Sequence, residues 1–290
     1  MGEFLQFLFS GITVGAIYAL VGLGFSIIYN ASHVINFAQG EFVMLGGMGT
    51  VSLMLAGLPM IVAAPLAVCL VVLVGLLLEK FAVEPARNAS VVTLIIITIG
   101  ASILIRGVVE VTLGKDFHRL PAFTGEEPII IGGAVLQPQG IWVLAALGVV
   151  VTALRWFFQR TRLGKAILAT SYNPLAAQLV GIETRTTLLV SFGLSAGLGA
   201  LAGILTAPIT LTKYDVGIML GLKGFAAAIL GGLGGVYGAV AGGLTLGVIE
   251  AMAAGYVSSS YKDAVAFVII LAVLFFMPSG LFGTKRTERV

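Results

Sequence analysis

The feature that most constrains this chain is a succession of apolar runs, each about as long as a membrane is thick. A helix needs roughly 20 apolar residues to cross the hydrocarbon layer, because every backbone polar group must be satisfied within the segment. Of the 290 residues, 59% are hydrophobic and 10% are charged, and the mean hydropathy is +1.10. A water-soluble domain of this size cannot bury so much apolar surface. The sequence therefore predicts an all-α integral membrane protein, a polytopic bundle.

Polar breaks divide the chain into eight or nine predicted membrane segments. In chain order these are 4–29, a polar-interrupted segment ending near 57, 60–78, 89–109, 140–158, 188–211, 217–230, 236–255 and 264–277. Pro278 and Gly280 stop the last one. The count stays open because the second segment could be re-entrant.

That second segment carries Asn36, Gln39 and Glu41 at a depth where polar side chains are costly and are often functional. One interpretation is that these residues line a transport pathway, together with the intervening Gly40. The other is structural: Asn36 and Gln39 cap a late-starting helix, and Glu41 in its first turn is favoured by the helix dipole. The residues alone leave both open.

The chain contains 39 glycines. Membrane helices associate by close backbone approach, which small residues four positions apart permit. We therefore expect most of these glycines to pack helices together. The pairs and triplets with this spacing are Gly11 and Gly15, Gly193 and Gly197, Gly199 and Gly203, Gly234, Gly238 and Gly242, and Gly243 and Gly247.

The longest polar and basic stretch runs from Arg160 to Arg185 and carries its own helix signals. Asn173 suits a helix N-cap, Pro174 suits the first helical position and Gly181 suits the end. We predict a short helix over 174–180, between two membrane spans. It is either an ordinary cytoplasmic turn or a docking helix on which a soluble partner acts.

A few charges fall inside the predicted membrane segments. Arg106 is four residues before Glu110, and a helical i,i+4 ion pair is the plain expectation. Lys223 and Glu250 lie in neighbouring segments, and one of the two possible alignments lets them pair. A substrate or proton site is the alternative. Cys69, the only cysteine, is expected to be a small core residue.

Lysine and arginine set the orientation by the positive-inside rule. Ten of the 16 lie in the 80–88 turn, the central loop or the C-terminal tail with Lys285, Arg286 and Arg289. This predicts that the loop (160–187) and the C-terminus are cytoplasmic, and that a lobe over 111–139 is extracytoplasmic. Within that lobe, Gly132 and Gly133 between two short apolar runs predict a hairpin.

Several chemistries have no sequence support. The chain lacks the G-x-x-x-x-G-K-[ST] nucleotide-binding loop and the HExxH, GxSxG and CxxC patterns, and it has two histidines in different segments. It also lacks a basic patch of the nucleic-acid-binding kind. We therefore predict no catalytic residue, no metal site and no cofactor, and we expect any work to be driven by a partner or an ion gradient.

Three stretches resemble one family. The residues are Asn36 to Glu41, NFAQGE; the central GKAILATSYNPLAAQLVGI; and the glycine-rich KGFAAAILGGLGGVYGAVAGG, with PSGLFG at the end. With these, the whole chain resembles the branched-chain amino acid ABC transporter permeases of the LivH type. The resemblance implies that the central loop contacts an ATPase. The matching residues are Gly164, Ala169, Asn173, Ala176, Ala177, Gly181 and Ile182, and we count Pro174 with them as a candidate ATPase contact.

The resemblance also implies partners and a location. We expect one transmembrane permease domain over 1–290 in a bacterial inner membrane, in contact with membrane lipid. It would assemble with a second related permease, two ATP-binding ABC subunits and an extracytoplasmic binding protein. The implied cargo is leucine, isoleucine, valine or a related compound; relatives for urea, amides and aromatic acids keep the substrate open. The rival from another class is an ion-coupled secondary transporter using Glu41, Lys223 and Glu250, and a channel is a distant third.

Overall fold

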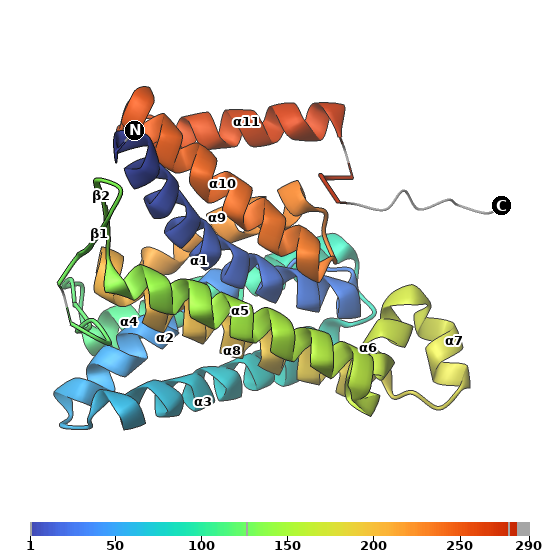
Figure 1. The fold of residues 1–290 in the computed structure, drawn as a ribbon. Coiled ribbons are helices and arrows are strands. Elements are labelled where there is room, and N and C mark those ends of the chain that lie inside the picture. The colour runs from blue at the N-terminus through green and yellow to red at the C-terminus, as the bar shows by residue number, and fades with distance from the viewer. Residues whose placement is uncertain (1, 126, 278, 283–290) are drawn as a thin grey trace. The chain divides into compact units, whose positions relative to one another are not determined.

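A computed structural model gives the fold, and it describes residues 2–125, 127–277 and 279–282. The sequence-predicted features at Pro278, Lys285, Arg286 and Arg289 lie outside these residues. The described chain consists of helices and one small hairpin (Figure 1). The elements are α1 (Gly2–Ser32), α2 (Gln39–Leu55), α3 (Met60–Leu78), η1 (Glu79–Val83), η2 (Glu84–Ala86), α4 (Val91–Leu113), β1 (Ile129–Ile131), β2 (Ala134–Leu136), α5 (Pro138–Arg160), α6 (Arg162–Tyr172), α7 (Pro174–Leu179), α8 (Thr184–Thr210), α9 (Val216–Gly231), α10 (Val236–Tyr256) and α11 (Lys262–Phe276).

Six helical segments in the described chain are long and apolar enough to cross a membrane, namely α1, α3 with η1 and η2, α4, α5, α8 and α10. The protein is thus all-helical and polytopic, as predicted. The count of eight or nine segments stays a prediction, because α2, α9 and α11 have 17, 16 and 15 residues.

The described residues form two compact units. Three of the boundaries between them fall inside α1, α5 and α9, and the fourth falls in the loop after Pro121. Unit 1 comprises Met1–Ser26, Ala122–Leu147 and Lys223–Val290. Unit 2 comprises Ile27–Pro121 and Gly148–Leu222.

Unit 2 is built around α2, α3 and α8, which pack against one another (Figure 1). Backbones approach closely where α2 meets α8, since a Cβ on Gly46 would overlap the Ala200 backbone and one on Gly203 the Val43 carbonyl. Phe42 and Phe192 are buried in the core beside this crossing. The predicted packing role is confirmed for Gly203.

Unit 1 uses the same device. Gly11 and Gly15 of α1 face the backbone of α10, and in return Gly243 and Gly247 of α10 face α1. Gly242 of α10 likewise lies against the backbone of α9. Helices in a membrane gain nothing from hiding apolar surface from lipid, so this close approach carries much of the packing.

The hairpin of unit 1 is confirmed at its predicted residues. Strands β1 and β2 pair antiparallel around Gly132 and Gly133, whose φ angles of 60° and 82° suit a type I′ turn. The Gln6 side chain holds the second strand by two hydrogen bonds: its Nε2 donates to the Val135 carbonyl at 3.1 Å, and the Val135 amide donates to its Oε1 at 2.6 Å.

One expectation about the fold is wrong, and one helix was not predicted. Cys69 is exposed instead of lying in the core, because α3 buries a narrow stripe of residues four apart, from Ala63 and Ala67 to Val71 and Gly75, and Cys69 is not on it. The central loop holds a second helix, α6, beside the predicted one. Its N-cap is Thr161, whose hydroxyl accepts a hydrogen bond from the Gly164 amide at 2.9 Å.

Candidate functional site

The loop that joins α1 to α2 in unit 2 contains the first predicted site residues. Helix α2 starts late, at Gln39, and Glu41 lies in its first turn, as the structural interpretation predicted. Asn36 does not cap the helix itself: its Oδ1 accepts a hydrogen bond from the Ala38 amide at 3.1 Å, within the loop. Its amide nitrogen has no hydrogen-bond partner among the described residues.

Gln39 does not act as a cap either, because its side chain crosses to α8. Its Nε2 donates to the Ser195 carbonyl at 3.1 Å, and the Ser195 hydroxyl donates to its Oε1 at 2.5 Å. Both residues are fully buried. This pair of hydrogen bonds ties the first turn of α2 to the middle of α8.

Replacing Ser195 with alanine should lower the free energy of unfolding by about 1–2 kcal/mol, because the change leaves the buried Gln39 Oε1 without its donor. Ser52→Ala is the matched control, since among the described residues the Ser52 hydroxyl bonds only to the Met48 carbonyl within its own helix. Unfolding of the purified protein in detergent would measure both. Equal stabilities for the two variants would contradict the assignment.

Gly40 brings two backbones into contact. A Cβ there would overlap the Gly217 carbonyl, and one on Gly217 would overlap the Gly40 carbonyl. The predicted pathway residue Gly40 therefore packs the start of α2 against the start of α9, which leaves no room for a side chain.

Glu41 is 1% exposed and faces α4. The Ser102 hydroxyl donates to its Oε1 at 2.8 Å, while Oε2 has no hydrogen-bond partner in the described part of the chain. The charged groups that interact electrostatically with the Glu41 carboxylate are Arg106 and Asp215. Three of the four predicted pathway residues thus contact another helix of unit 2, namely Gln39, Gly40 and Glu41, while Asn36 bonds within its own loop. The role of all four in a pathway stays a prediction.

The expected ion pair between Arg106 and Glu110 is wrong. Glu110 instead binds Lys115, with 2.7 Å between Oε1 and Nζ. Gly114 ends α4 with a φ of 81°, and this turn brings the next residue back to the helix. Spacing along an ideal helix could not predict a partner beyond its end.

The predicted short helix in the central loop is confirmed as α7. The Asn173 Oδ1 accepts a hydrogen bond from the Ala176 amide at 3.0 Å, and Pro174 is at the first helical position. Gly181 ends the helix with a φ of 84°, and the Ile182 amide then donates to the Ala177 carbonyl at 2.9 Å. Each signal acted as its local chemistry predicts.

Exposure divides the predicted coupling residues. Asn173, Pro174, Ala176 and Gly181 are exposed; Ala169 and Ile182 are half-buried; and Gly164 and Ala177 are buried. Gly164 lies against the Phe157 carbonyl, so it packs α6 onto the end of α5.

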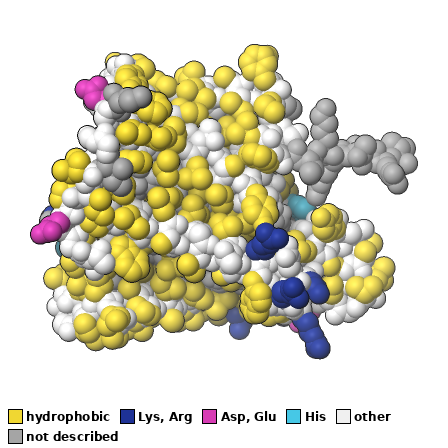
Figure 2. All heavy atoms as spheres, in the orientation of Figure 1, with side chains coloured by type: hydrophobic (Ala, Val, Ile, Leu, Met, Phe, Trp, Pro, Cys, Tyr) yellow, Lys and Arg dark blue, Asp and Glu magenta, His cyan; other side chains and the backbone are white. Residues whose placement is uncertain are grey.

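Helix α7 and its flanks present large apolar side chains that nothing in unit 2 covers. Tyr172, Leu175, Leu179 and Val180 are 87%, 69%, 82% and 77% exposed. Figure 2 shows lysine and arginine side chains gathered beside this region. The exposed basic residues at the end of α5 and around α6 and α7 are Arg155, Arg160, Arg162, Lys165 and Arg185. An apolar surface with a basic border is typical of a protein interface.

In unit 1 Lys223 and Glu250 do pair, with 2.8 Å between Nζ and Oε1. Two further partners were missed from the sequence. The Lys223 Nζ lies 2.7 Å from Asp263 Oδ1, and the Tyr18 hydroxyl donates to Glu250 Oε2 at 2.8 Å. Lys223, Glu250 and Tyr18 are 8%, 5% and 3% exposed. These four residues, the Lys223 cluster, join α1, α9, α10 and α11.

Comparison with known proteins gives consistent matches. The family model described as "Branched-chain amino acid transport system / permease component" matches residues 7–274. The permease protein LivH of a high-affinity branched-chain amino acid transport system in Salmonella typhimurium is 34% identical over 99% of this chain and 98% of its own length. The corresponding BraD of Pseudomonas aeruginosa is 32% identical over the same shares.

One solved structure shares the fold. PsaBC from Streptococcus pneumoniae, determined in complex with Fab, aligns with a TM-score of 0.53 over 96% of this chain and 93% of that chain. The sequences are 14% identical, so this match concerns architecture alone.

Proposed function

Because this chain belongs to the family of permease components of branched-chain amino acid transport systems, we propose that it is the membrane-spanning subunit of an ATP-driven ABC importer. Its cargo is leucine, isoleucine, valine or a related small compound. The observation that carries this proposal is the match to LivH over almost the full length of both proteins. Family membership does not support the ion-coupled secondary transporter.

The chain works as part of a complex. Its partners are a second homologous permease, two ABC ATPase subunits that bind ATP, and an extracytoplasmic binding protein that delivers the cargo. The capped helix α7, with exposed Leu175 and Leu179, supports a docking surface for an ATPase subunit.

The orientation follows from the basic residues. The exposed cations around α6 face the cytoplasm, and so does the C-terminus; 111–139 is the extracytoplasmic lobe. In this arrangement α2, α9 and α11 also cross or enter the membrane, which would bring the six long segments to nine. The whole of 1–290 acts as one permease domain.

Transport proceeds by alternating access. ATP binding in the partner subunits moves α7. The motion reaches α5 through α6, which precedes α7 in the chain, and reaches α8, which follows it. Asn36, Gln39, Gly40 and Glu41 lie near the pathway that opens between the two permeases. Lys223 and Glu250 hold helices together, since each has a partner for its charge.

Reconstitution tests the function directly. The chain is placed in liposomes with candidate ATPase and second-permease subunits, and ATP hydrolysis is followed after loaded binding protein is added outside. We expect stimulated hydrolysis and ATP-dependent uptake of leucine. Uptake by the chain alone along a proton gradient, with no stimulation, would overturn the proposal.

Gly181→Val should reduce the stimulated ATPase activity about tenfold or more while the protein still inserts in the membrane. A β-branched residue is strained at a φ of 84°, and the cost of about 1–3 kcal/mol falls on the end of α7. Gly107→Val is the control, because that glycine in α4 has open space around it and no positive φ. Full stimulation in Gly181→Val would count against docking by α7.

A further inference from the structure

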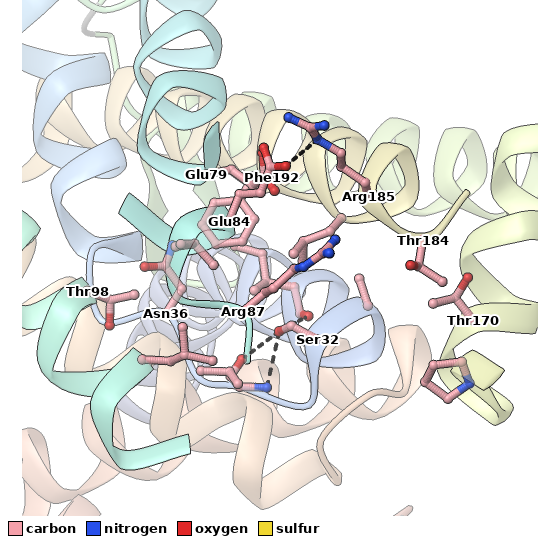
Figure 3. Close-up of a pocket in the computed structure, with 17 residues that line it drawn as sticks. Ser32, Asn36, Glu79, Glu84, Arg87, Thr98, Thr170, Thr184, Arg185 and Phe192 are labelled. Carbon is pink, nitrogen blue, oxygen red and sulfur yellow. Dashed lines mark hydrogen bonds and ion pairs between the residues drawn. The ribbon is translucent and has the colours of Figure 1, made fainter. Parts of the chain in front are cut away.

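Unit 2 contains a cavity of about 180 Å³ next to the start of α7. Its walls come from the end of α1, the loop that follows it, η1, η2, α4, α6, α8 and the first residue of α7, Pro174 (Figure 3). A single buried water needs roughly 10–15 Å³. The cavity can therefore hold a small organic molecule.

Two buried side chains that line this cavity carry polar atoms without a hydrogen-bond partner among the described residues. Glu79 is 1% exposed, and neither carboxylate oxygen accepts a hydrogen bond. Asn36 is 1% exposed, and its Nδ2 donates none. Burying such groups unpaired costs free energy, more for a charged group, so their presence indicates a ligand that satisfies them.

The backbone at Glu79 is unusual too. Glu79–Val83 form a π-helical turn that continues α3. Single π turns are rare and occur often at functional sites. Here the turn supplies Glu79 and Val83 to the cavity wall.

The other charged side chains at the cavity are an ion pair and Arg87. Glu84 and Arg185 form an ion pair with each other, and they are the charged groups whose fields reach Glu79 (Figure 3). Arg87 lines the same cavity, and no ion pair joins it to a described acidic residue. The cavity thus offers an acceptor at Glu79 and donors at Asn36 and Arg87.

The rest of the wall is mixed. The hydroxyl side chains of Ser32, Thr98, Thr170 and Thr184 line it. The large apolar side chains of Val34, Leu94, Leu188 and Phe192 line it too. The apolar part fits an aliphatic group, because it buries methyl groups without stranding a polar atom.

We propose that this cavity binds a small aliphatic amino acid as its zwitterion. Glu79 receives the ammonium group, Asn36 Nδ2 and Arg87 receive the carboxylate, and the side chain packs against Val34, Leu94 and Phe192. The proposal rests on the proposed function, since it makes this cavity a station for the transported compound inside the permease. A metal ion or other inorganic cation would leave the donors and the apolar wall unused.

The test is equilibrium binding of radiolabelled leucine to the reconstituted complex without its binding protein. Leucinamide, which keeps the ammonium group, and 4-methylpentanoate, which lacks it, are the competing compounds. We expect wild-type protein to bind leucine at least tenfold more tightly than 4-methylpentanoate. In Glu79→Gln, leucine binding should fall at least tenfold, while binding of 4-methylpentanoate should not fall.

Glu183→Gln is the matched control, because it makes the same change on an exposed side chain that does not line the cavity. It should bind leucine like the wild type. Glu79→Gln should also unfold at the wild-type temperature or above, since it removes a buried charge without a partner. Unchanged leucine binding in Glu79→Gln would overturn the proposal, and so would a large loss of stability, which would make Glu79 structural.

This test separates the two proposals. Wild-type liposomes that import leucine with ATP, but whose complex binds no leucine without the binding protein, would overturn the cavity assignment alone. A complex that binds leucine through Glu79 but shows no ATP-driven uptake would overturn the importer function alone.

Discussion

Replacing Lys223 with methionine is expected to lower the free energy of unfolding by about 3–5 kcal/mol, because a buried ion pair that loses one partner leaves an uncompensated charge. The Lys223 ammonium contacts Glu250, Asp263 and the Tyr18 hydroxyl. Without it, two carboxylates remain close together. Lys262, with its Nζ 3.7 Å from Glu250 Oε1, is a distant substitute. Unfolding of the purified protein in detergent would measure the loss.

Lys213→Met is the matched control for that variant. Lys213 pairs with Asp215 at 2.9 Å, and about a third of each side chain is exposed. Exposed pairs contribute up to roughly 1 kcal/mol. The double variant Lys223→Met, Glu250→Gln should recover part of the lost stability, because one of the two stranded charges is gone. If Lys223→Met cost no more than Lys213→Met, the Lys223 cluster would have no structural role.

The second large effect is expected at the crossing of α2 and α8. Gly203→Ala should lower the free energy of unfolding by about 2–3 kcal/mol or more. The new Cβ would overlap the Val43 carbonyl oxygen, which belongs to the rigid backbone. Gly203→Leu should prevent accumulation of folded protein. Yield in the membrane and unfolding in detergent are the measurements.

Gly100→Ala makes the same chemical change in α4, where a Cβ would meet open space. Alanine favours helix over glycine by up to about 1 kcal/mol, so this variant should be as stable as the wild type or more stable. Equal effects at Gly203 and Gly100 would show that helix propensity, and not the α2–α8 crossing, decides the outcome.

Local chemistry explains what the sequence could predict. Helix α7 and the hairpin were found because Asn173, Gly181 and the Gly132-Gly133 turn act on residues within a few positions. The spans were found because their length is set by the bilayer. Helix α6 carries equally local signals, including its Thr161 cap, but its basic residues made the stretch resemble a loop.

Contacts between segments far apart in the chain are harder to predict from the sequence. Sequence analysis allowed Lys223 to pair with Glu250 in one of two alignments, yet nothing near either residue points to Tyr18 or Asp263. Gln39 pairs with Ser195, 156 positions away. Composition also cannot tell lipid-facing from inward-facing residues in a helix that is apolar all round, which is why Cys69 was misplaced; the stripe of small residues is the better guide.

The π-helical turn after α3 sets the angular phase of the charges that follow it. Four buried residues of α3, from Ala63 to Gly75, recur every four positions, and Glu79 and Val83 keep that interval; Leu78 is buried beside them. In an α-helix four residues overshoot a full turn by roughly 40°, so such a stripe winds around the axis. A π turn takes more residues per turn and winds the stripe back.

If the same residues of Glu79–Val83 formed ordinary α-helical turns, everything beyond them would be rotated relative to α3. Glu84 would turn away from Arg185, and Arg87 would turn away from the cavity. Every charged side chain would still be present in the sequence. The spacing of these charges, and not only their identity, is what this segment has to preserve.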